Sequence, residues 1–260
     1  MKQRAITAVI ALAALFVVLF ALPPVAVKIT IAAVVLVGAW EWSGLFKTSS
    51  LLLRLVYVAI IAALLWAFAE PFASYAEPLL VISMFWWLLA LLWTFFFPTP
   101  IPAAVRWLAG AVVLVPMYVA LIMLYDIERW LFLFALLLVW VADSGAYFAG
   151  KRFGRVKLAP AISPGKTWEG VIGGLVAVVL LTMARALLTE TDLAVFVPFC
   201  LAVAALSIVG DLTVSMFKRT AGVKDSGALF PGHGGVLDRV DSIAAATPLF
   251  ALGTSWVGLR

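Results

Sequence analysis

Residues 192–241 read DLAVFVPFCLAVAALSIVG followed by DLTVSMFKRTAGVKDSGALFPGHGGVLDRVD. The first part is almost free of charge and is long enough to cross a bilayer as a helix, which takes about 20 apolar residues. The second part carries eight charged side chains and the only histidine of the chain. At roughly 3 kcal/mol per charge at the bilayer centre, placing them all in lipid would cost on the order of 20 kcal/mol. We therefore expect a membrane-spanning helix that leads into a charged segment in water or in a wet cavity at the membrane surface.

The composition of the whole chain is that of an integral membrane protein. Of its 260 residues, 66% are apolar and only 12% are charged, whereas about a quarter of the residues in a soluble domain are charged. We predict an all-α fold, a polytopic helical bundle embedded in the lipid bilayer. The net charge of +5 is explained by loop charges that set the membrane topology, so no nucleic-acid partner is expected.

Apolar runs mark about nine transmembrane helices. They fall near residues 5–22, 25–41, 51–69, 78–97, 107–125, 130–149, 170–189, 192–210 and 240–258. The second is the least regular because Lys28 lies close to its start. The first follows Lys2 and Arg4 as the core of a signal peptide would, but it is long, and another run begins directly after Pro23-Pro24. We therefore expect the first run to be retained as a helix.

Lysine and arginine are distributed unequally between the two sides of such a bundle. With the N-terminus in the cytoplasm, 14 of the 18 basic residues lie inside and 4 lie outside, which predicts this orientation, with the C-terminus outside. The two long polar segments, 150–169 and 211–240, then face the cytoplasm. Because the polar residues are concentrated after Asp143, we divide the chain into an N-terminal transmembrane scaffold, residues 1–125, and a C-terminal functional transmembrane bundle with cytoplasmic loops, residues 126–260.

Asp211 closes the eighth apolar run. If the helix continues beyond it, Asp211, Ser215 and either Lys218 or Arg219 lie on one stripe of the helix. A carboxylate, a hydroxyl and a cation would then face one cavity. Taken alone, Asp211 is explained equally well as a charge at a helix end that reaches water.

Asp238 and Asp241 lie at the start of the last apolar run, three residues apart, and can project from one helical face. Acidic residues in a first turn also suit the helix dipole. With Asp211 and Asp225 nearby in the sequence, a shared Mg²⁺ site is the stronger interpretation, because Mg²⁺ takes a few carboxylate oxygens together with waters and substrate phosphates.

The segment Pro231–Gly235 is a glycine-rich turn before the last helix, and such a turn can present backbone N–H groups to a phosphate. The signal is weak by itself, because glycine-rich turns are common. His233 in this turn is either a functional residue or a loop residue held by hydrogen bonds. Mg²⁺ ligation by its imidazole is not expected.

The polar region that comes earlier in the chain reads DSGAYFAGKRFGR at residues 143–155 and SPGKTWEG at residues 163–170. Asp143 is an intramembrane carboxylate and hence a candidate functional residue. Ser163-Pro164 is typical of a helix N-cap followed by proline, which would place Lys166 in the first turn, where it could attract phosphate. Close helix packing is the expected role of three glycines: Gly170, Gly173 and Gly174.

A long motif runs through the charged segment: Ser215-x-Phe217-Lys218-Arg219-x4-Lys224-Asp225-x-Gly227-x2-Phe230-Pro231-x-His233-Gly234-Gly235-Val236-x-Asp238-Arg239-Val240-Asp241. With this motif the chain resembles the phosphatidate cytidylyltransferases, also called CDP-diacylglycerol synthases. The resemblance extends upstream through 143–151, 163–170 and 207–215. It implies a transferase of phospholipid biosynthesis that converts CTP and phosphatidic acid into CDP-diacylglycerol and pyrophosphate. It also implies Mg²⁺ as cofactor, with a second, monovalent cation such as K⁺ left open.

The resemblance further implies roles for individual residues. Asp211 and Asp238 are the expected metal ligands. The other expected catalytic residues are Lys218, Arg219, Lys224, Asp225, His233, Arg239 and Asp241. The expected nucleotide-pocket residues are Asp143, Ser163, Lys166, Gly234 and Gly235. Such a protein is expected to be a homodimer in the inner membrane of a bacterium, with its active site facing the cytoplasm.

Two other classes of protein remain open at this point. A transporter could use Asp143 and Asp211 as ion or proton sites, but it has little need for long cytoplasmic loops rich in glycine, lysine and arginine. Another membrane nucleotidyltransferase or phosphotransferase would share these loops. The DG-x2-AR motif typical of CDP-alcohol phosphotransferases does not occur in the chain.

Overall fold

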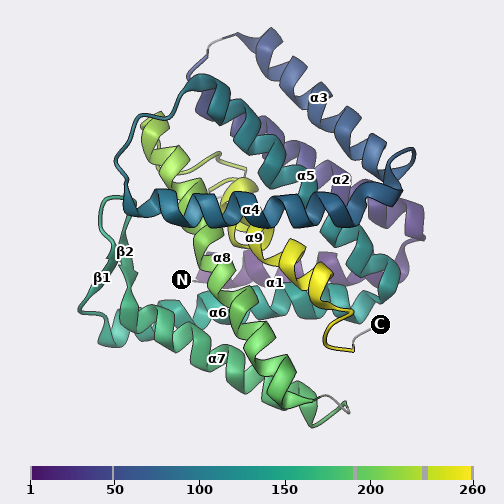
Figure 1. Cartoon of the computed structure of the whole chain (residues 1–260), viewed down its shortest axis with the longest axis vertical. Helices are drawn as coiled ribbons and strands as arrows, with labels where there is room; N and C mark the ends of the chain where they lie inside the picture. The colour runs from purple at the N-terminus through teal and green to yellow at the C-terminus, as the bar shows by residue number, and fades with distance from the viewer. Residues whose placement is uncertain (1, 49, 190–191, 230–233, 259–260) are drawn as a thin grey trace.

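The protein is described here by a computed structural model that covers residues 2–48, 50–189, 192–229 and 234–258. Within these ranges the chain forms nine α-helices, two short 3-10 helices (η1 Gly44–Phe46 and η2 Ala73–Tyr75) and one small hairpin (Figure 1). The helices are α1 Lys2–Ala21, α2 Pro24–Ser43, α3 Leu51–Ala69, α4 Ala76–Phe95, α5 Ala103–Ile127, α6 Arg129–Phe153, α7 Trp168–Ala186, α8 Leu193–Ala221 and α9 Leu237–Gly253. The hairpin strands are β1 Lys157–Ala159 and β2 Ser163–Thr167. The prediction of an all-α membrane bundle with about nine helices is confirmed.

Seven of the helical segments in the described residues are long and apolar enough to cross a membrane: Pro24–Phe46, Leu51–Ala69, Ala73–Phe95, Ala103–Ile127, Arg129–Phe153, Trp168–Ala186 and Leu193–Ala221. Helix α8, with 29 residues, is about 43 Å long at 1.5 Å per residue. This exceeds the roughly 30 Å of hydrocarbon in a bilayer. One end of α8 therefore reaches beyond the apolar layer or the helix tilts strongly.

The helix ends follow local sequence signals. Pro23 is the N-cap of α2 and Pro24 is its first residue, a position where proline fits because its missing N–H has no helical partner. Asp192 caps α8 by accepting a hydrogen bond from the Ala194 N–H at 2.9 Å. At the other end, Gly222 takes the left-handed conformation with φ of 81°, which terminates α8 and frees the chain to turn.

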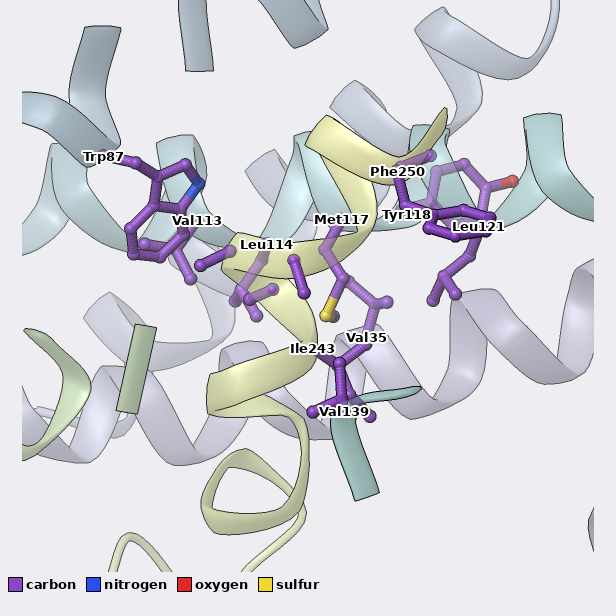
Figure 2. Close-up of a cluster of buried hydrophobic side chains, with 14 of the residues drawn as sticks. Val35, Trp87, Val113, Leu114, Met117, Tyr118, Leu121, Val139, Ile243 and Phe250 are labelled. Carbon is purple, nitrogen blue, oxygen red and sulfur yellow. The ribbon is translucent and has the colours of Figure 1, made fainter. Parts of the chain in front are cut away.

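Helix α9 occupies the middle of the bundle, with α4, α5, α6 and α8 packed around it (Figure 1). Every residue from Asp241 to Pro248 is buried. Small side chains make this possible, because the segment reads DSIAAATP. Figure 2 shows part of the surrounding core, where Ile243 and Phe250 of α9 lie among apolar side chains of α2, α4, α5 and α6. This core joins helices from both predicted parts of the chain.

The outer helices present apolar side chains away from the core. Leu52 on α3, Phe85 on α4 and Ile172 on α7 are each at least 60% exposed. In water such a surface would be costly, whereas in a bilayer lipid tails cover it. The outer surface of the bundle thus suits contact with lipid, whereas small and aromatic side chains fill its interior.

Helices α6 and α7 pack at very close range. A Cβ added at Gly174 would lie 2.7 Å from the Ala142 carbonyl oxygen, and one at Gly170 would lie 2.9 Å from that of Ala146. A Cβ at Gly173 would overlap the side chain of Ala149. The expected packing role of these glycines is confirmed.

The hairpin was not predicted, and it corrects the interpretation of Ser163. Ser163 is not a helix N-cap, because it begins strand β2 and pairs with Ala159 of β1. A residue that precedes proline is driven toward extended backbone, which agrees with this placement. Helix α7 is capped instead by Thr167, whose Oγ1 accepts from the Gly170 N–H at 3.2 Å. Lys166 consequently lies on the strand and not in a first helical turn.

Candidate active site

The polar residues meet in one cavity of about 610 Å³ between α6, α7, α8, α9 and strand β2. Ten of the predicted site residues line it: Asp143, Lys166, Asp211, Lys218, Arg219, Lys224, Asp225, Asp238, Arg239 and Asp241. Together with Lys151, which also lines the cavity, the lining combines five carboxylates with six cationic side chains. Such a mixture can hold polyphosphate and metal ions together, with acids for the metal and bases for phosphate oxygens.

A buried ion pair forms part of the wall of this cavity. The Lys218 Nζ is 2.6 Å from the Asp238 Oδ1, and the two side chains are only 8% and 7% exposed. The Asp241 Oδ2 lies 4.0 Å from the same Nζ. Helix α8 supplies the lysine and the start of α9 supplies both acids, so this contact joins the two neighbouring helices.

The second oxygen of Asp238 holds the chain before α9. Its Oδ2 accepts from the Ser226 N–H at 2.9 Å and from the Gly235 N–H at 2.8 Å. Gly234 has φ of 79°, and a Cβ there would overlap the Asp238 carboxylate. The glycine therefore lets the backbone approach the Asp238 carboxylate closely.

Asp211 lies inside α8 and not at its end, because the helix continues to Ala221. The predicted stripe exists: the Ser215 Oγ donates to the Asp211 Oδ1 at 3.1 Å. The Lys166 Nζ contacts the Asp211 Oδ2 at 2.7 Å, with side chains 25% and 28% exposed. One residue before Asp211, a Cβ at Gly210 would lie 2.5 Å from the Asp241 carbonyl oxygen. This close crossing of α8 and α9 brings Asp211 to the depth of Asp241.

Arg219 ties the hairpin to the end of α8. Its Nε donates to the Ile162 carbonyl at 3.1 Å and its Nη1 donates to the Val223 carbonyl at 3.0 Å. The hairpin that carries Lys166 is thereby fixed against α8. This position also keeps the Arg219 side chain on the cavity wall.

Three predicted nucleotide-pocket residues are not part of the cavity lining: Ser163, Gly234 and Gly235. The glycines contribute through the backbone contacts of Asp238, whereas Ser163 has a structural place in the hairpin. His233 lies outside the described residues.

Two charged residues in or next to the site, Lys151 and Glu41, were not predicted. Lys151 lines the cavity from α6. Glu41 of α2 is 6% exposed and accepts hydrogen bonds from the segment before α9. The only sequence signal for Glu41 was an acidic residue at the end of the second apolar run.

The comparison with known proteins agrees with the chemistry of this cavity. The sequence model of the cytidylyltransferase family matches residues 2–256. The chain belongs to the cytidylyltransferase family. A protein of Pseudomonas aeruginosa named phosphatidate cytidylyltransferase is 42% identical, with 96% of each chain covered. One of the same name from Haemophilus influenzae is 37% identical over 96% of this chain and 97% of its own.

A shorter match is concentrated in part of the chain. A phosphatidate cytidylyltransferase of Thermotoga maritima is 45% identical over 117 residues, which is 42% of this chain and 43% of that protein. The predicted family and the predicted nucleotidyltransferase class are confirmed by these matches.

The cavity of this cytidylyltransferase has suitable groups for Mg²⁺. Among the residues that the structure describes, no three acidic, histidine or cysteine side chains converge into a ready-made metal cage. Mg²⁺ commonly takes only one or two carboxylates and completes its shell with waters and substrate phosphates. Asp211 and Asp238 offer carboxylate oxygens from neighbouring helices on the wall of one cavity. The donor set therefore fits an ion that arrives with a nucleotide.

Proposed function

We propose that the protein transfers CMP from CTP to phosphatidic acid and so forms CDP-diacylglycerol. A phosphate oxygen of phosphatidic acid attacks the α-phosphorus of CTP, a new P–O bond forms, and the bond to the β-phosphate breaks to release pyrophosphate. The attacking phosphate is already an anion at neutral pH, so no general base is needed. The main barrier is repulsion between two polyanions, which cationic groups and correct positioning reduce.

One observation carries this proposal: five carboxylates and six cationic side chains line a single cavity in a bundle surrounded by apolar surface. The cations can hold phosphate oxygens of both substrates. The apolar surroundings suit a substrate with acyl chains. The names of the relatives that match nearly the whole chain support the same reaction.

The pairing of charges in the cavity suggests how substrates are received. Asp211 contacts Lys166 from the hairpin, and Asp238 contacts Lys218 from α8. Each lysine is thus held near a candidate metal ligand. We assign Asp211 and Asp238 to Mg²⁺, which when bound would neutralise phosphate charge as a Lewis acid. Lys166 and Lys218 are assigned to phosphate oxygens.

The site is assigned to the cytoplasmic side of a bacterial inner membrane, as the distribution of lysine and arginine favours. On the opposite side, Lys28 at the start of α2 pairs with Asp126 at the end of α5 at 2.7 Å. Both residues belong to the side that the charge count placed outside. A homodimer with one cavity per subunit remains part of this proposal.

The deciding experiment supplies the purified protein with radiolabelled CTP, phosphatidic acid and Mg²⁺. We expect labelled CDP-diacylglycerol and pyrophosphate, and no lipid product when phosphatidic acid is replaced by diacylglycerol or when Mg²⁺ is chelated. A protein that retains its fold in detergent but forms no CDP-lipid would refute the proposed function. Product formation unaffected by chelation would refute the metal assignment alone.

A further inference from the structure

Glu41 is a buried acid that lies outside the cavity lining and has a dense set of hydrogen bonds. It is located on α2, and its residue is 6% exposed. Its Oε1 accepts from the Val236 N–H at 3.0 Å. Its Oε2 accepts from the Leu237 N–H at 2.8 Å and from the Ser226 hydroxyl at 2.8 Å. A carboxylate so deeply buried is retained only where such donors compensate for its desolvation.

These contacts place Glu41 at the N-terminus of α9. The first N–H groups of a helix have no partner within the helix, and a negative charge there is favoured by the helix dipole. Val236, the N-cap residue, provides no side-chain cap. Glu41 supplies the missing acceptor from a position 195 residues earlier in the chain.

The backbone before α9 is also shaped around this carboxylate. An added Cβ at Gly227 or Gly235 would overlap the Glu41 side chain. Both glycines therefore permit a close approach of the backbone to Glu41, and a Cβ at either position would have to displace the Glu41 carboxylate. Ser226 and Gly235 donate their N–H groups to Asp238 as well. The same short segments are thus held on one side by Glu41 and on the other by Asp238.

We infer that Glu41 is a positioning residue for the transfer reaction. It fixes the start of α9 and the segment at Ser226, and through them it holds Asp238 in contact with Lys218. This inference rests on the proposed function. It adds to the same site a supporting carboxylate from α2, which lies behind the cavity wall. Glu41 does not touch the cavity and acts only through Asp238 and its neighbours.

The test compares Glu41→Gln with Val35→Ala. Glutamine keeps the shape of glutamate but can accept at only one of its two polar atoms, so at least one donor of the segment loses its partner. Val35 lies on the same helix, is 1% exposed and packs in the core beside Ile243 and Val139 (Figure 2), outside the cavity lining. Val35→Ala therefore serves as a control that lowers stability without changing the contacts of the segment.

We expect Glu41→Gln to lower kcat of the folded protein about 10- to 100-fold, as the loss of one or two hydrogen bonds to a charged group would. The KM for phosphatidic acid should change by less than about threefold, because Glu41→Gln replaces none of the cationic side chains that are assigned to phosphate oxygens. Val35→Ala should retain kcat within about twofold even if its thermal midpoint falls equally. Equal losses of kcat in both variants, or normal kcat in Glu41→Gln, would overturn the inference.

A second measurement does not depend on catalysis. Hydrogen–deuterium exchange at the Val236 and Leu237 amides should accelerate at least tenfold in Glu41→Gln and stay unchanged in Val35→Ala. Failure of the wild-type protein to form CDP-lipid would refute the proposed function. The exchange measurement would still test whether Glu41 binds the Val236 and Leu237 amides. Unchanged exchange at both amides in Glu41→Gln would show that Glu41 does not hold the start of α9.

Discussion

Replacing Asp238 by asparagine tests the link between the buried ion pair and catalysis. The change keeps the side-chain shape but removes the charge that Lys218 contacts at 2.6 Å, where the side chains are 8% and 7% exposed. Breaking a buried pair from one side costs about 3–5 kcal/mol. Asp241, 4.0 Å from the same Nζ, compensates in part, so we expect a loss near the lower limit, about 3 kcal/mol. Activity should fall to near zero, because a proposed metal ligand is lost as well.

Asp211→Asn gives the contrasting result. The Asp211–Lys166 pair is also short, at 2.7 Å, but its side chains are 28% and 25% exposed. Partly exposed pairs contribute little, so we expect a stability loss of about 1 kcal/mol or less. Activity should nevertheless fall as strongly as in Asp238→Asn. The double variant should be scarcely less active than either single one, because we propose that both acids bind the same metal ion.

Asp126→Asn is the matched control, since its pair with Lys28 has the same 2.7 Å length but lies at the opposite end of the bundle with side chains 38% and 50% exposed. It should change neither activity nor stability measurably. The assay is CDP-lipid formation across a Mg²⁺ titration, together with thermal unfolding in detergent. Near-normal turnover of Asp238→Asn or Asp211→Asn at low Mg²⁺ would refute the metal assignment. Equal losses of stability in Asp238→Asn and Asp211→Asn would refute the claim that the more deeply buried ion pair contributes more to stability.

Three further outcomes are expected. Lys166→Ala should raise the KM for CTP about tenfold or more with little loss of folded protein, because the proposed charge-assisted bond between Lys166 and a CTP phosphate is removed. A variant that lowers only the yield of protein and leaves this KM unchanged would contradict the prediction. A cysteine in place of the exposed Lys157 should be labelled only from the cytoplasmic side of sealed cells, with no background from the buried Cys200, and labelling from outside would reverse the orientation. Gly174→Val should destabilise the protein by about 1–3 kcal/mol through overpacking against α6, and an unchanged thermal midpoint would show that α6 and α7 can separate.

Much of the architecture followed from the order of residues alone. Uninterrupted apolar runs predict membrane helices because no other open backbone arrangement satisfies its polar groups in lipid. The glycines of α7 indicated tight packing before the partner helix was known. The long motif from Ser215 to Asp241 predicted the family, and the family match over residues 2–256 confirmed it.

Other features depend on contacts between distant segments and could not be read in this way. Ser163-Pro164 has the local pattern of a helix start, yet pairing with Ala159 makes it a strand. The pairing of Lys166 with Asp211 requires the crossing of the hairpin and α8. Glu41 has no local pattern at all, because its donors lie 185 to 196 residues away in the chain. Sequence patterns report short-range geometry and solvent preference, whereas the partner of a buried charge is decided only when the helices pack.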